Sequence, residues 1–123
     1  MTIQSHHYVL AVHDLDRTRD WYQRVLGCEA EEVDPGNWVF LSTDGVTFMC
    51  GRCPDATSPA DLGDHAYFAY LVVDDVDSWH ERAEREGADV LKAPKDEPWG
   101  MREMARRTVD GHRMMVASKL AQS

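Results

Sequence analysis

The sequence has few cysteines, few basic residues and no long apolar run, and each shortage excludes a class of protein. Three cysteines among 123 residues are an odd number and too few for a disulfide-stabilised scaffold. No apolar stretch approaches the ~20 residues that a membrane-spanning helix needs. The N-terminus also lacks the charged and then apolar layout of a signal peptide. We therefore expect a cytoplasmic protein that has no membrane partner.

Basic residues are outnumbered by acidic ones. The chain has 13 Lys and Arg against 22 Asp and Glu, which gives a net charge of −9 at pH 7. A protein that binds phosphate backbones needs a basic surface, so we do not expect nucleic acid as a partner. The acidic balance suits a cationic small molecule, although the same charge can serve only to keep a protein in solution.

The chain contains one pattern twice, at residues 7–31 and again at residues 68–92. Each copy reads as an apolar strand, an Asp-rich helix start, a helix closed by glycine, and a second strand. The landmarks correspond in pairs: Asp14 with Asp75, and Gly27 with Gly87. Asp accepts hydrogen bonds from the free N–H groups at a helix start, and Gly is the usual left-handed stop. The repeat therefore predicts an internal duplication.

This duplication predicts an α+β chain of two tandem βαβββ modules, at residues 1–53 and 65–123, joined by a linker at 54–64. The linker is polar and contains two prolines and a glycine. Helices are predicted at 15–26 and 76–86, and a strand follows Gly27. The other predicted strands are 6–12, 38–42, 46–50, 67–73, 89–92, 101–108 and 113–118, with residues 93–100 as a loop.

The final segment, PWGMREMARRTVDGHRMMV, together with the paired modules resembles the vicinal oxygen chelate superfamily. This superfamily includes glyoxalase I, extradiol dioxygenases, fosfomycin-resistance enzymes and bleomycin-resistance binding proteins, and the resemblance is nearest to the bleomycin-resistance branch. It implies two curled mixed sheets around a cleft and a homodimer. Sheet edges left uncovered in small modules also favour pairing between chains.

Metal-dependent members of this superfamily hold a divalent ion with a His on the first strand of each module and a Glu on the last. His7 stands at the first of these positions, but the matching position of the second module is Phe68. The last-strand position falls on Met115, and the first-module strand VTFMC has no carboxylate. His65 lies three residues before Phe68, so it could replace the missing histidine ligand only if the register of that strand shifted. One ligand does not make a metal site, so we expect no metal cofactor.

Aromatic residues are the better indication of a site. The alternation of strand side chains places Trp38 with Phe40 on one face, and Phe68 with Tyr70 on another. Trp99 lies in the loop before the last hairpin. The acidic residues Asp96, Glu97 and Glu103 lie close to it in the sequence and would provide the negative charge that attracts a cationic ligand. Packing in the core is the alternative for each aromatic residue, and it is the expected role of Trp21 and Trp79. Arg102 and Glu103 alternate along one strand, so only one faces the cleft, and His112 is expected to be exposed.

These observations predict a protein that binds a small aromatic or cationic ligand without converting it, as antibiotic-resistance binding proteins do. The predicted ligand-binding residues are Trp38, Phe40, Phe68, Tyr70, Trp99, Glu103 and Met115, and no residue is predicted to be catalytic. The alternative is a metal-dependent lyase, isomerase or dioxygenase that uses His7. A pair of thiols, Cys50 and Cys53, follows a strand rather than opening a helix, and we interpret it as structural.

Overall fold

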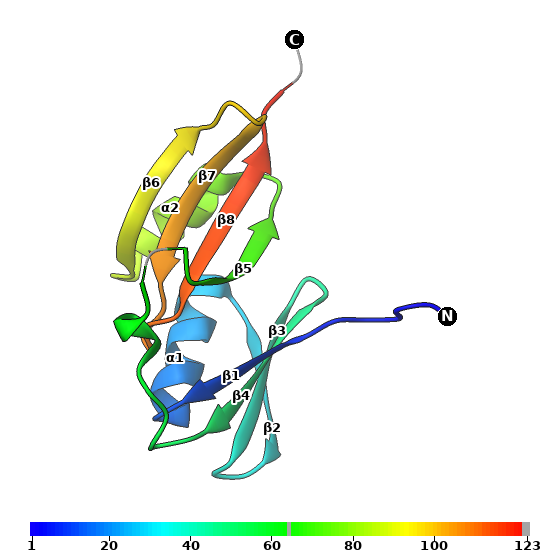
Figure 1. Cartoon of the computed structure of the whole chain (residues 1–123), viewed down its shortest axis with the longest axis vertical. Coiled ribbons are helices and arrows are strands. Elements are labelled where there is room, and N and C mark those ends of the chain that lie inside the picture. Colours follow the sequence, from blue (N-terminus) through cyan, green and yellow to red (C-terminus); the bar gives the residue numbers. More distant parts are fainter. Residues whose placement is uncertain (64, 122–123) are drawn as a thin grey trace. The chain divides into compact units, whose positions relative to one another are not determined.

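The computed structural model describes residues 1–63 and 65–121, and the chain folds as two compact units, Met1–Thr57 and Ser58–Ser123. Both units have the predicted βαβββ order (Figure 1). The elements of the first unit are β1 (Tyr8–Val12), α1 (Leu15–Leu26), β2 (Glu29–Asp34), β3 (Trp38–Thr43) and β4 (Val46–Arg52). The second unit has η1 (Pro59–Asp61), β5 (Tyr67–Val72), α2 (Val76–Arg85), β6 (Asp89–Asp96), β7 (Met101–Arg107) and β8 (Arg113–Lys119).

Each unit forms one four-stranded mixed sheet. The strand order is β1-β4-β3-β2 in the first unit and β5-β8-β7-β6 in the second. The first strand of each unit pairs in parallel with the last, and the remaining neighbours are antiparallel. The predicted α+β fold with two tandem modules is confirmed, because the topology of the first sheet is repeated strand for strand in the second.

Both helices begin where the sequence predicts; α1 also ends as predicted, whereas α2 ends at Arg85, one residue before the predicted end. The Asp14 carboxylate accepts a hydrogen bond of 3.1 Å from the backbone N–H of Arg17, and Gly27 closes α1 in the left-handed conformation at φ 72°. The Asp75 carboxylate accepts from the backbone N–H of Asp77 in the same way, at 3.1 Å. Such caps satisfy N–H groups that have no partner within the helix.

Each helix covers one face of its sheet with an apolar stripe. In the first unit α1 buries Thr18, Trp21, Tyr22, Val25 and Leu26. The Tyr22 ring lies 5.0 Å from the ring of Phe48 on β4, so this aromatic pair joins helix to sheet. In the second unit α2 buries Val76 and Ala83, and Val76 forms a core cluster with Met104 and Val116, against which Leu71, Val73 and Trp79 pack. Trp21 is buried as predicted, whereas Trp79 is only partly buried.

A buried arginine joins α2 to its sheet. Arg106 on β7 is 1% exposed, and its guanidinium donates to the Glu84 carboxylate and to the backbone carbonyl of Ala88, both at 3.2 Å. His80 Nδ1 is a third neighbour of the same group. A guanidinium carries five donors, so burial requires several acceptors at once. The helix-facing side of β7 is therefore polar at this position.

Three details differ from the prediction. β1 begins at Tyr8 rather than at residue 6, and the segment 54–64 contains the short helix η1. The segment 93–96, which was predicted to be a loop, continues β6 as far as Asp96. Irregularities in the β6–β7 pairing between Val90 and Lys95 accommodate Pro94 in this edge strand. Within the described part of the chain, no helix is long and apolar enough to span a membrane.

The α1 cap provides a test of the fold. Replacing Asp14 by Ala removes the acceptor of the Arg17 N–H, so we expect the free energy of unfolding to fall by about 1 kcal/mol. Asp14→Asn keeps a side-chain oxygen at the same position and should retain most of the stability. Urea denaturation measures both. Equal losses in the two variants would contradict the capping role.

Candidate functional site

The candidate site lies on the face of the second sheet that points away from α2. Arg102 and Glu103, which the sequence left undecided, point to opposite faces of β7. Arg102 turns to the helix side, where it pairs with Asp77 at 3.1 Å and with Asp96 at 2.9 Å. Glu103 turns to the other face, is only 3% exposed, and forms its hydrogen bonds there.

The Glu103 carboxylate accepts hydrogen bonds from three side chains. Tyr70 Oη on β5 lies 2.5 Å from Oε2, and the indole Nε1 of Trp99 donates to the same oxygen at 2.7 Å. Lys92 Nζ on β6 donates to Oε1 at 3.2 Å. Burial raises the pKa of Glu103, but these three donors outweigh it and hold the pKa below the usual range. Glu103 is therefore ionised at neutral pH.

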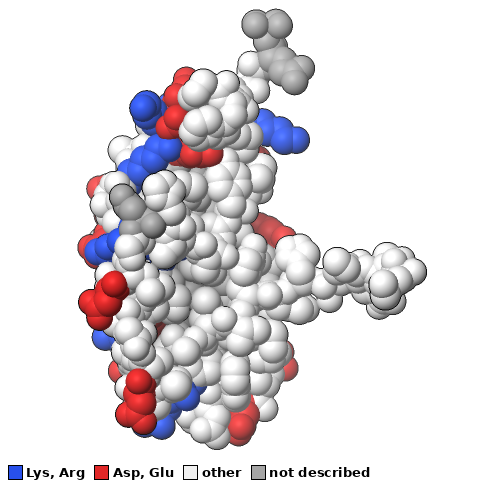
Figure 2. Space-filling view, in the orientation of Figure 1, with Lys and Arg blue, Asp and Glu red and all other residues white. Residues whose placement is uncertain are grey.

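Lys92 is the residue of this network that the sequence did not indicate. Its Nζ also lies 2.7 Å from the Glu97 carboxylate, so one ammonium group joins two carboxylates. Burial lowers the pKa of Lys92, but the hydrogen bonds to Glu97 and Glu103 and their charges raise it by more. The pKa of Lys92 therefore lies above its ordinary value. On the face shown in Figure 2, basic side chains of the second unit lie beside acidic ones. The three acidic residues predicted to serve a ligand, Asp96, Glu97 and Glu103, therefore each pair with a cation of the chain itself.

The two aromatic partners of Glu103 remain open to solvent. The side chain of Trp99 is 62% exposed and that of Tyr70 is 41% exposed, although both are tied at their polar ends to one oxygen. The backbone also fixes Trp99, because the Glu97 N–H donates to the Met101 carbonyl at 2.8 Å and Gly100 adopts φ 87°. We call Tyr70 and Trp99 the aromatic platform. Core packing is thus the wrong description of Trp99.

An open groove lies beside Trp99. Its volume is about 900 Å³, and it lies between the β6–β7 connection and the end of β8. The lining residues are Glu97, Pro98, Trp99, Gly100, Met101, Lys119, Leu120 and Ala121. Its size is in the range of small-molecule sites in proteins.

The first unit carries its own aromatic pair. Trp38 and Phe40 alternate with the buried Val39 and are half-buried on the face of β3 opposite α1. Trp38 lies across Gly51 on the neighbouring strand, where a Cβ atom would approach the indole ring to 2.7 Å. Because Gly51 has no side chain, the ring of Trp38 can pack directly against the backbone of β4. That Trp38 and Phe40 bind a ligand remains a prediction.

Two further predicted residues lie in the second sheet, and one of them, Met115, is on the same face as Tyr70. Met115 on β8 pairs in register with Tyr70 and is half-buried. Phe68 lies further along β5, and its ring meets the ring of His112 edge-on at 5.6 Å. His112 was predicted to be exposed, and this was wrong: the ring is partly buried against Phe68, and burial lowers its pKa.

The residues present do not fit a divalent metal centre. His7 is exposed, and its Nε2 lies 3.3 Å from Ser5 Oγ. The matched positions hold Phe68 and Met115, neither of which supplies a hard donor atom. Among residues 1–63 and 65–121, no three His, Cys, Asp or Glu side chains converge. The cysteines are free thiols, with Cys50 buried and Cys53 exposed.

The family model of the Glyoxalase/Bleomycin resistance protein/Dioxygenase superfamily matches residues 4–116. The chain belongs to this superfamily. A search of curated proteins found no match. The family assignment confirms the resemblance to the vicinal oxygen chelate superfamily that the last hairpin indicated.

Solved structures of the superfamily fold cover nearly the whole chain. TioX from Micromonospora sp. ML1 is 27% identical, with 98% of this chain and 99% of that chain covered and a TM-score of 0.73. The fosfomycin resistance protein FosX from Listeria monocytogenes is 17% identical over 96% and 94%, with a TM-score of 0.77. A glyoxalase/bleomycin resistance protein/dioxygenase from Alicyclobacillus acidocaldarius is 14% identical over 96% and 92%, with a TM-score of 0.80.

The Glu103 network predicts an unusual titration of Tyr70. Burial, together with the hydrogen bond to Glu103 and its charge, raises the pKa of Tyr70 to about 12. In Glu103→Gln the charge is removed, so we expect the pKa of Tyr70 to move toward 10. Absorbance of tyrosinate at alkaline pH measures it, and Tyr70→Phe identifies the signal.

Glu97→Gln is the matched control, because Glu97 contacts Lys92 while Glu103 accepts the Tyr70 hydrogen bond. This variant should leave the late tyrosine titration in place. The raised pKa also means that the folded state loses stability as the pH rises from about 10 to about 12. A Tyr70 titration that is the same in Glu103→Gln and the wild type would refute the assigned hydrogen bond.

Proposed function

We propose that this chain is a small-molecule binding protein that sequesters a planar aromatic ligand, neutral or singly cationic, without converting it. The observation that carries the proposal is the aromatic platform. Its two rings are exposed, yet a shared buried carboxylate fixes their polar ends. A ligand that stacks on rings already held in place loses less binding energy to ordering of the site.

The charges around the platform favour this class of ligand. Lys92 contributes one positive charge and Glu97 and Glu103 contribute two negative ones, so the cluster carries a net charge of −1. Aromatic rings attract cations through their negatively charged faces. The cluster therefore favours a neutral or singly cationic ligand over an anion, while Lys119 adds one positive charge to the lining of the groove.

The chemistry of Glu103 supports binding rather than conversion. A general base works best when its pKa lies near the operating pH, and the pKa of Glu103 is held below its ordinary acidic value. Both of its oxygens already accept hydrogen bonds from the chain. The carboxylate is therefore suited to orient Tyr70 and Trp99 and poorly suited to take a proton from a ligand.

The similar structures support a role in antibiotic resistance. The superfamily description includes bleomycin resistance proteins, and the FosX structure is described as a fosfomycin resistance protein.

The platform predicts how variants of its two rings behave. Stacking on an aromatic side chain adds about 1 kcal/mol beyond the buried area, so a double variant that lacks the rings of both Tyr70 and Trp99 should bind a planar cation more than tenfold more weakly. We would measure binding of proflavine by fluorescence, with the anionic dye 1-anilinonaphthalene-8-sulfonate as the weaker comparison. Trp99→Ala should cost about 1.5–3 kcal/mol of stability, because it removes a hydrogen bond to the ionised Glu103, whereas the mostly exposed ring itself contributes little.

Trp99→Phe is the matched control for the hydrogen bond. It keeps an aromatic ring but lacks the Nε1–H that donates to Glu103, so its binding should fall between those of the wild type and Trp99→Ala. Proflavine binding that is the same in the wild type and in the double variant would overturn the proposed site. A loss of about 3–5 kcal/mol of stability in Trp99→Ala would instead indicate a core residue.

We also propose that the protein is a homodimer. Each sheet has two edge strands within its unit, β1 and β2 in the first and β5 and β6 in the second. Edge strands carry backbone groups that pair readily with another chain, and the acidic residues along β2 oppose pairing at that edge. Light scattering at micromolar concentration should give twice the chain mass of 14.0 kDa. A mass of one chain throughout would contradict this proposal.

A further inference from the structure

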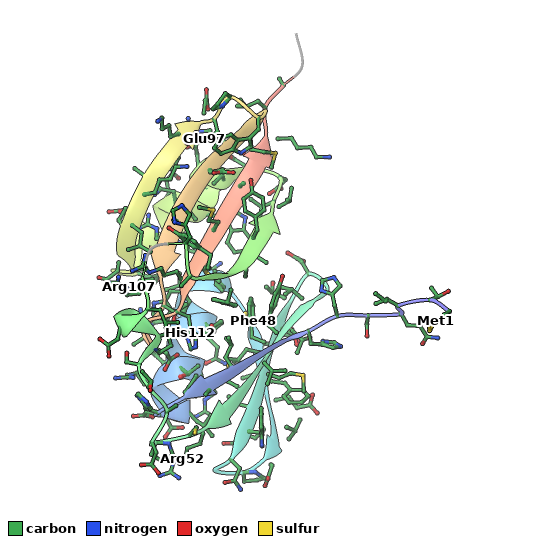
Figure 3. The ribbon with its side chains drawn as sticks, viewed as in Figure 1. Met1, Phe48, Arg52, Glu97, Arg107 and His112 are labelled. Atoms are coloured by element: carbon green, nitrogen blue, oxygen red, sulfur yellow. The ribbon has the colours of Figure 1, made fainter. Side chains whose placement is uncertain are left out.

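A second pocket lies in the second unit, at the end of β7 opposite Trp99. Figure 3 shows Glu97 and His112 at the two ends of this sheet. The pocket has a volume of about 250 Å³. Its lining residues are Pro59, Leu62, Ala66, Tyr67, Phe68, His112 and Arg113. The pocket therefore lies between the segment that contains η1 and the β7–β8 turn.

Two contacts hold the segment that contains η1 against the β7–β8 turn. Gly111 adopts φ 95°, and a Cβ atom there would come within 2.8 Å of the Ala60 backbone nitrogen. The Arg113 guanidinium donates to the Leu62 carbonyl at 3.3 Å. The turn itself is fixed by the backbone N–H of His112, which donates to Thr108 Oγ1 at 3.2 Å. The walls are thus in place before any ligand binds.

The size and the walls of the pocket fit one ring. Of the seven lining residues that the structure describes, five present apolar or aromatic surface, and Leu62 is an exposed hydrophobic residue at the pocket. An apolar cavity of about 150 Å³ is known to bind benzene in another protein. A pocket of about 250 Å³ therefore takes a single ring with a substituent.

His112 supplies the polar group of the pocket. Its ring is partly buried edge-on against Phe68, and burial lowers its pKa, so the imidazole is neutral at pH 7. Of the residues that the structure describes, none forms a hydrogen bond with either ring nitrogen. Nδ1 is buried, which leaves Nε2 as the nitrogen that a ligand can reach.

We propose that this pocket binds a single uncharged aromatic ring that carries a hydroxyl group, with the ring packed on Phe68 and the hydroxyl hydrogen-bonded to Nε2 of His112. A hydroxyl group both donates and accepts, so it serves either tautomer of the neutral imidazole. This site does not depend on the aromatic platform.

The test is a titration of the full chain with phenol, followed by NMR of ¹³C-labelled histidine. The His112 signal should shift in a saturable manner, and phenol should bind more tightly than toluene, which has the same shape but no hydroxyl. In His112→Phe, where this signal is absent and calorimetry measures binding instead, the preference for phenol over toluene should disappear. In Ala66→Leu the added side chain fills the pocket, and phenol binding should weaken at least tenfold.

Ala93→Leu is the matched control, because Ala93 is exposed on β6 and adds the same bulk outside the pocket. It should show the same phenol-dependent shift of the His112 signal as the wild type, and so should Trp99→Ala, which separates this site from the platform. Phenol binding that survives Ala66→Leu unchanged, or a phenol preference that survives His112→Phe, would overturn the proposal. A His112 signal that depends on protein concentration without phenol would show that a second copy covers the pocket, which also overturns it.

Discussion

The buried carboxylate of Glu103 is the constraint on which the candidate site depends. An ionised carboxylate removed from water costs several kcal/mol unless its oxygens receive hydrogen bonds and a positive charge lies close by. Glu103 meets this requirement with donors from β5, from β6 and from the connection before β7. These segments must therefore keep their relative positions for the charge to remain buried. The arrangement of the aromatic platform follows from the electrostatics of one residue.

The alternation of side chains along β7 places two kinds of polar interaction on opposite faces of the sheet. On the helix side of β7, Arg102 and Arg106 pair with acidic residues of α2 and hold the helix to the sheet. On the other side, Glu103 faces Lys92 and the two aromatic rings. Because successive side chains of a strand point to opposite faces, a shift of one residue would exchange these roles. The register of β7 therefore determines both the packing of α2 and the composition of the site.

Local signals in the sequence were sufficient for the elements and insufficient for the contacts. Asp14 and Gly27 act through neighbours within a few residues, so the limits of α1 could be predicted. Lys92 could not be connected with Glu103, because the irregular pairing of β6 decides which of its side chains reach β7. The burial of His112 depends on a segment about fifty residues earlier, which packs against the turn through Ala60. Sequence periodicity contains no information about such contacts between distant segments.

The duplicated modules show that one topology can orient a tryptophan by two different physical means. In the first unit Trp38 is seated by packing, because Gly51 leaves space for its ring. In the second unit Trp99 is oriented by a hydrogen bond to an ionised carboxylate. Packing does not respond to protons, whereas the hydrogen bond weakens once Glu103 is protonated. Because the pKa of Glu103 is lowered, this protonation happens only below the pH at which an ordinary glutamate titrates. The aromatic platform therefore keeps its geometry at neutral and mildly acidic pH. The topology of the module, which both units share, determines neither whether such a platform forms nor over which pH range it is stable.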